Sequence, residues 1–171
     1  MKQAFAPLQL KITVTEAAVA ALAAGLALLL GVPIWAMFLG WNAYFTRGAG
    51  LKSGLVNLGC VLIGVGLGMT AQGLVRALPG APGPAEQIGS VFGVTLVVLS
   101  LRFLPRFNNI PGFFLGLVAY FASGLDPSLH ALGVLGTAAV LGSTAGWLSS
   151  AAQARWVEAG SPEIADTPAP T

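Results

Sequence analysis

Charge is what this chain has least of: Asp, Glu, Lys and Arg together make up 8% of its 171 residues. Hydrophobic residues make up 56%, and the mean hydropathy is +0.82. A soluble globular domain is typically about 45–50% apolar and about 25% charged, so these few charges cannot cover a water-exposed surface. The composition therefore predicts an integral membrane protein whose main partner is the lipid bilayer.

Several chemical functions lack the residues they would need. The net charge of +2 excludes the strongly basic surface typical of nucleic-acid binding. Cysteine and histidine occur once each, as Cys60 and His130, so neither an internal disulfide nor a Cys/His metal cluster can form. The chain also lacks a phosphate-binding loop, a zinc-protease motif and a recognisable Ser-His-Asp set. We expect no catalytic residue, cofactor or metal, and a protein that is not an enzyme.

Ionisable side chains are missing from the middle of every apolar segment. Glu16 and Asp126 fall at expected helix starts, where the helix dipole favours a carboxylate. Proton-coupled and ion-coupled carriers usually place ionisable groups inside the membrane. Their absence here argues against a proton antiporter and against a voltage sensor.

Glycine and proline divide the apolar sequence into six segments. The first apolar run, residues 14–45, would be about 48 Å long as one helix, whereas the hydrocarbon core is about 30 Å thick. It must therefore break, and the Gly31-Val32-Pro33 stretch is the expected place. The predicted helices are 14–31, 33–46, 52–77, 86–103, 110–123 and 127–155.

These helices form two sets of three, an all-α arrangement. The first set is 14–77, and a loop rich in Pro and Gly, 78–85, leads to the second set, 86–155. We interpret residues 1–13 as a retained cytoplasmic segment rather than a cleaved signal. The polar, Pro-rich tail, 156–171, is expected to be disordered.

The middle helix of each set carries nearly the same eight letters. FLGWNAYF at 38–45 and FLGLVAYF at 114–121 share six letters, 76 positions apart. Three crossings per set is an odd number, so the second set would enter the membrane from the opposite side. The sequence therefore predicts two inverted three-helix repeats, each with a short middle helix.

The basic residues favour full crossings over re-entrant middle helices. With six crossings and a cytoplasmic N-terminus, every basic residue except Arg76 lies inside, and both termini are cytoplasmic. With two re-entrant helices, four of the eight basic residues lie on each side. The positive-inside rule favours the first arrangement. The basic residues are Lys2, Lys11, Arg47, Lys52, Arg76, Arg102, Arg106 and Arg155.

The repeated motif is the candidate solute path. Short segments bounded by Gly and Pro at matching places in two halves point to a transport site. The motif glycines would let the two backbones approach each other, and the aromatic side chains would form walls. The alternative is a motif for helix packing alone, with Asn42 bonding between helices. The candidate path residues are Phe38, Gly40, Trp41, Asn42, Tyr44, Phe45, Phe114, Gly116, Tyr120 and Phe121.

Three stretches resemble a known family: WAMFLGWNAYF, GLKSG and IPGFFLGLVAYFASG. They are similar to the YcdZ-like bacterial inner membrane proteins, the domain of unknown function 1097 family, over most of residues 15–150. The resemblance implies a small multi-pass protein of the bacterial cytoplasmic membrane. It implies no catalytic residue, because the family is one of unknown function.

These observations lead to two functional hypotheses. The lack of intramembrane charge and the aromatic-glycine repeat favour a channel or facilitator for a small neutral solute. The alternative is a non-transporting membrane scaffold or assembly protein. A bundle this small can enclose little space, so we also expect a homo-oligomer.

Overall fold

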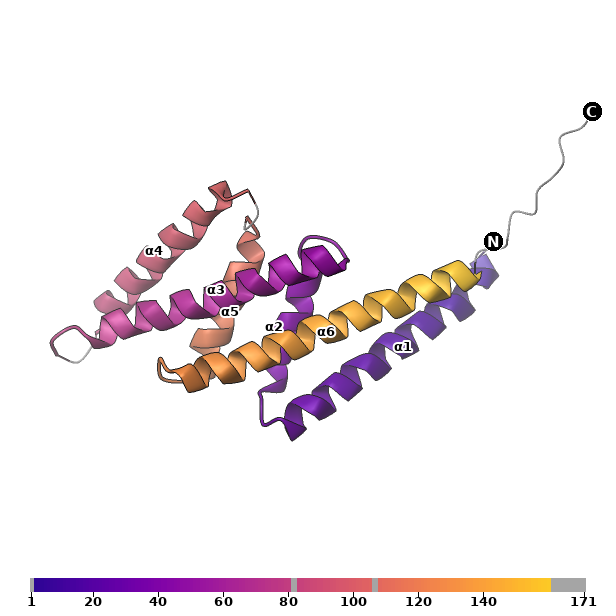
Figure 1. Cartoon of the computed structure of the whole chain (residues 1–171), viewed down its shortest axis with the longest axis horizontal. Helices are drawn as coiled ribbons and strands as arrows, with labels where there is room; N and C mark the ends of the chain where they lie inside the picture. Colours follow the sequence, from indigo (N-terminus) through magenta and orange to yellow (C-terminus); the bar gives the residue numbers. More distant parts are fainter. Residues whose placement is uncertain (1, 81–82, 106–107, 161–171) are drawn as a thin grey trace, which may run out of the picture.

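The computed structural model describes residues 2–80, 83–105 and 108–160, and within these ranges the chain is helical, with no strand. Figure 1 shows how the helices are arranged. Four stretches are long and apolar enough to cross a membrane: Pro7–Leu29, Leu51–Arg76, Pro84–Phe103 and Leu129–Glu158. The expectation of a helical, membrane-compatible protein is confirmed. The elements are α1 (Lys2–Leu29), α2 (Ile34–Phe45), α3 (Leu51–Arg76), α4 (Pro84–Ser100), η1 (Leu101–Phe103), α5 (Ile110–Ser123) and α6 (Leu129–Gly160).

Local breakers set the bounds of the short helices. The break between α1 and α2 falls where glycine and proline predict it, because Gly31 adopts a φ of +66° and Pro33 is extended. Helix α5 has the predicted bounds, with Pro111 in its first turn and Gly124 in the left-handed conformation after its last residue. Helices α2 and α5 have 12 and 14 residues, or about 18 and 21 Å.

The two terminal helices are longer than predicted. Helix α1 begins at Lys2 rather than at residue 14, and α6 runs from Leu129 to Gly160 rather than over 127–155. The end of α6 contacts the middle of α1, because the Trp156 indole Nε1 donates to Thr15 Oγ1 at 3.1 Å. The Lys11 ammonium lies 5.6 Å from the centre of the same indole ring. Residues 156–160 belong to α6 rather than to the predicted tail.

Four parts of the sequence predictions lie outside the described residues. They are Met1 of the N-terminal segment, residues 81–82 of the Pro- and Gly-rich loop, Arg106, and the remainder of the predicted tail, 161–171.

Each short helix packs mainly on the last helix of the other half of the chain. Helix α2 packs across α6, and α5 packs across α3, in the two most extensive contacts of the fold. Helix α1 covers α6, and α4 lies against α3. Figure 1 shows α2 and α5 crossing the long helices steeply. The contacts between halves therefore exceed those within a half.

Candidate functional site

The first motif glycine lies where α2 crosses α6. A methyl group added at Gly40 would lie 2.5 Å from the carbonyl oxygen of Ala139 and 2.7 Å from its Cα. On the other side of the crossing, a methyl group at Gly142 would overlap the carbonyl oxygen of Met37. The Ser143 hydroxyl donates to the Gly40 carbonyl at 3.2 Å. The crossing brings two backbones into direct contact.

The second motif glycine lies in an equivalent crossing of α5 on α3. A methyl group at Gly116 would overlap the Val61 carbonyl oxygen and lie 2.9 Å from the Gly64 Cα. A methyl group at Gly64 would overlap the Phe113 carbonyl oxygen. Each contact has its counterpart in the first crossing, 76 positions away on the short helix and 78 positions away on the long one.

The motif tyrosines also occupy equivalent positions in the two crossings. Tyr44 packs on Gly146, and Tyr120 packs on Gly68, at the same 76 and 78 position offsets. Both tyrosines are 2% exposed. Both tyrosines pack tightly on the facing glycines, since a methyl group would lie 2.8 Å from the Tyr120 ring at Gly68 and 3.1 Å from the Tyr44 Cβ at Gly146.

The two hydroxyls differ in their hydrogen bonds. Tyr44 Oη accepts from the Gly50 backbone N–H at 3.0 Å and lies 3.5 Å from Ser150 Oγ. Tyr120 Oη is buried and has no hydrogen-bond partner within the described part of the chain. A buried polar group without a partner is costly. The crossing that contains Tyr120 is therefore less stabilised by hydrogen bonds than the crossing that contains Tyr44.

A buried amide cluster joins α2, α3 and α5 on the Tyr44 side. Asn57 is fully buried, and its Nδ2 donates to the Tyr44 carbonyl at 3.0 Å. Asn109 is 2% exposed, and its Nδ2 lies 2.7 Å from both Asn57 Oδ1 and Thr46 Oγ1. The Asn109 Oδ1 accepts from the Gly112 N–H at 3.3 Å and so caps α5.

In the opposite half of the chain, the positions equivalent to Asn57 and Asn109 hold apolar residues. Leu135 stands 78 positions after Asn57, and Pro33 stands 76 positions before Asn109. The cluster therefore breaks the correspondence between the halves. Asn109 was not singled out from the sequence, although an Asn directly before Ile110-Pro111 is a helix N-cap signal.

The ten candidate path residues do not gather around one cavity. The motif glycines and tyrosines are buried in the crossings, and Trp41 and Phe114 are half-buried. The others, Phe38, Asn42, Phe45 and Phe121, are exposed on the outside of the chain. Helices α2 and α5 do contact each other, but the motif glycines approach α6 and α3 rather than one another.

A small hollow lies beside the first motif, between α2, α3 and α6. Its volume is about 100 Å³, and Tyr44, Gly54, Ser143 and Thr144 contribute to its lining. Three of its lining residues, Tyr44, Ser143 and Thr144, carry a hydroxyl, and none of its lining residues carries a charge.

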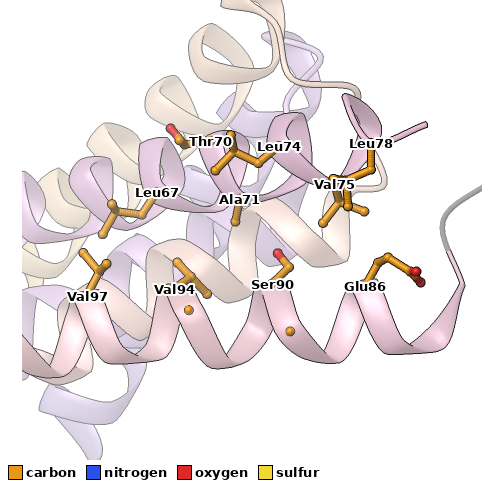
Figure 2. A pocket seen from close by; sticks show the side chains of 12 residues that line it. Leu67, Thr70, Ala71, Leu74, Val75, Leu78, Glu86, Ser90, Val94 and Val97 are labelled. Carbon is orange, nitrogen blue, oxygen red and sulfur yellow. The ribbon is translucent and has the colours of Figure 1, made fainter. Parts of the chain in front are cut away.

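A larger groove of about 640 Å³ runs between α3 and α4, and Figure 2 shows the side chains that line it. Most of the lining is aliphatic, from residues such as Leu67, Leu74 and Val97. The described residues contain no group of three or more His, Cys, Asp or Glu side chains that could hold a metal.

Comparison with known proteins places the chain in a family. The family DUF1097, described as a protein of unknown function, matches residues 13–154. No curated protein and no solved structure matches the chain. The family match extends from α1 into α6 and includes both motif helices and both crossings. This chain therefore belongs to the DUF1097 family of proteins of unknown function.

Proposed function

We propose that the protein is a non-enzymatic facilitator for a small, uncharged solute. The observation that carries the proposal is the hollow beside Tyr44. Its volume of about 100 Å³ equals that of about three water molecules in the liquid. The Tyr44, Ser143 and Thr144 hydroxyl oxygens can still accept hydrogen bonds from a neutral solute, and no charged side chain lines the hollow to attract an ion.

The hollow is next to the crossing of α2 and α6. Ser143 lines the hollow and also donates to the Gly40 carbonyl, so a shift at the crossing would change the hollow. The buried amide cluster continues from Tyr44 through Asn57. Polar side chains inside a membrane are costly, and they often mark the path of a solute.

The proposal includes six crossings arranged as two inverted repeats in a bacterial inner membrane, with both termini cytoplasmic. The paired crossings at Gly40 and Gly116 support it, as does the distribution of basic residues. Inverted halves with short middle helices are typical of secondary transporters, whose halves move against each other. Because both crossings are closed by backbone contact, passage would require α2 and α5 to shift on α6 and α3.

A homo-oligomer is part of the same proposal. The hollow opens to the outside of a single copy, and one copy buries little of its apolar surface. Large apolar side chains such as Leu29 at 84% and Leu129 at 87% are exposed. A second copy could cover part of this surface.

The scaffold alternative has its own supporting observation. Gly40 and Gly116 are in tight contact with neighbouring backbones, which is what a packing motif requires. A scaffold needs no movement at the crossings and predicts no solute flux.

Solute flux into proteoliposomes separates the two functions. We would measure re-swelling by stopped-flow light scattering with water, urea and glycerol, using the wild type and Thr144→Leu. Thr144 lines the hollow, and its hydroxyl bonds only to its own helix, at the Val140 carbonyl 2.8 Å away. Leucine there should fill the hollow without disturbing a crossing and should slow re-swelling several-fold.

The matched control is Thr13→Leu. Thr13 is an exposed threonine whose hydroxyl bonds to the Gln9 carbonyl of its own helix, and it is remote from the hollow. Its flux should equal that of the wild type. Wild-type rates equal to those of empty liposomes for every solute, with folded protein present, would contradict a facilitator and favour the scaffold.

A further inference from the structure

The two halves differ in how the first helix of each set meets the third helix of the other set. Helix α1 contacts α6 through the buried Ala23 and Ala27, and α4 contacts α3 through the buried Val94 and Val98, both 71 positions later. We call the α1–α6 contact the first seam and the α4–α3 contact the second seam. Near the C-terminal end of α6, the hydrogen bond between Trp156 and Thr15 closes the first seam. The corresponding end of the second seam carries Leu78 and Glu86, which line the open groove.

Small residues on α4 create this groove. Gly89, Ser90 and Gly93 lie along it, and a methyl group at either glycine would meet no atom within 4 Å. In the first seam, the positions that match Ser90 and Gly93 hold Val19 and Leu22. Figure 2 shows the aliphatic side chains of α3 facing the thinly covered side of α4.

The dimensions of the groove select the kind of occupant. From Leu67 to Leu78 it follows α3 for eleven residues, or about 16 Å. A volume of about 640 Å³ over about 16 Å gives a cross-section of about 40 Å². A helix with its side chains is 10–12 Å wide, which corresponds to about 80–110 Å². A whole helix of a second copy therefore does not fit inside the groove and could only rest on its open side, whereas an extended hydrocarbon chain fits inside.

One end of the groove is polar and acidic. Glu86 is the only charged residue among those that line it, and its carboxylate is exposed at the start of α4. One carboxylate oxygen accepts from the Gly83 N–H at 2.8 Å. The cation on the neighbouring helix end, Arg76, is paired with Asp126. The charge of this end therefore complements a positively charged group at the membrane surface.

We propose that the groove between α3 and α4 binds a bilayer phospholipid with an ammonium headgroup. One acyl chain lies along Leu67, Leu74 and Val97 over Gly93, and the ammonium lies against the Glu86 carboxylate. The apolar length and the single acidic end together specify an amine-bearing lipid rather than an anionic one.

Native mass spectrometry of the full chain tests this site. Purified protein in detergent is mixed with equal amounts of phosphatidylethanolamine and phosphatidylglycerol, and the lipids retained are counted. The wild type should retain phosphatidylethanolamine preferentially. Gly93→Leu should reduce retention about fivefold, since about 1 kcal/mol of lost contact corresponds to that factor. Gly25→Leu, at a glycine of α1 that also has no atom within 4 Å, should retain lipid like the wild type.

A charge variant tests the headgroup separately. Glu86→Gln keeps a side chain that can cap the Gly83 N–H and removes only the charge. It should bind both lipids equally. Ser90→Leu provides a second way to fill the groove if Gly93→Leu does not fold.

Three results would overturn the proposal. The first is unchanged lipid retention in folded Gly93→Leu and Ser90→Leu proteins. The second is equal retention of the two lipids by the wild type. The third is a wild-type dimer that Gly93→Leu converts to a monomer, since the occupant would then be a second copy.

Discussion

Asn57 and Asn109 are buried among apolar helices, and each amide forms hydrogen bonds with neighbouring helices. Asn57 connects α3 to the last turn of α2, and Asn109 connects the start of α5 to both. Hydrogen bonds between membrane helices contribute modestly, on average about 0.6 kcal/mol and at most about 1.7 kcal/mol in measured cycles. The stabilisation is concentrated on the Tyr44 side of the fold, because Tyr120 Oη has no corresponding partner in the described residues.

Removing Asn57 should destabilise the protein more than removing an exposed amide. Asn57→Leu leaves the Tyr44 carbonyl without its partner and removes one of the two hydrogen bonds of the Asn109 Nδ2 group, at a cost of about 1–3 kcal/mol. Asn42→Leu should change the free energy of unfolding little, because Asn42 is exposed. The measurement is unfolding by denaturing detergent in mixed micelles.

A double-mutant cycle gives the matching test for the pair. Asn57→Leu combined with Asn109→Leu should cost less than the sum of the two single changes, because the second change removes a group that the first left unpaired. Strict additivity of the two would show that the amides do not act together.

At the scale of helices, the local sequence predicts where a helix begins or ends better than it predicts which helices pack together. Proline and glycine alone predict the end of α1 and both bounds of α5. The end of α6 contacts the middle of α1 through Thr15 and Trp156, 141 residues apart, and no local pattern reveals this contact. The motif glycines were predicted to approach each other, but they approach α6 and α3.

The physical reason lies in how membrane helices choose partners. Lipid tails are as apolar as leucine, so an apolar face alone does not specify what covers it. A small residue such as Gly40 shows that some backbone comes close. Which backbone comes close depends on the facing surface, here Ala139 and Gly142 on a helix about one hundred residues later. The buried site was missed for a similar reason, because Asn57 acquires its role only when Asn109 lies beside it.

The crossings themselves should be intolerant of a single methyl group. Gly40→Ala and Gly116→Ala each place a Cβ against backbone atoms that cannot rotate away, so we expect each to cost about 1–3 kcal/mol of unfolding free energy. Gly66→Ala, where a methyl group meets no atom within 4 Å, should be neutral or stabilising by about 0.5–1 kcal/mol. Thermal unfolding in detergent gives the ranking. A Gly40→Ala protein as stable as Gly66→Ala would show that the crossing is looser than described.

At the scale of the whole molecule, the halves correspond at their crossings and differ around them. The contacts of Gly40 and Tyr44 recur at Gly116 and Tyr120, whereas the amide cluster occurs on one side only. In a facilitator with two inverted halves, this difference would favour one closed side over the other. The inverted arrangement is therefore the claim on which the proposed function depends.

Labelling single cysteines from either side of the membrane tests that arrangement most directly. In a Cys60→Ala background, Leu30→Cys and Ala49→Cys place exposed thiols in the turns before and after α2. The account predicts that a membrane-impermeant maleimide reaches position 30 in intact spheroplasts and position 49 only after lysis. Labelling of both positions in intact spheroplasts would place the two ends of α2 on the same side of the membrane and make α2 re-entrant. The two halves would then have the same orientation, and the inverted repeat would be wrong.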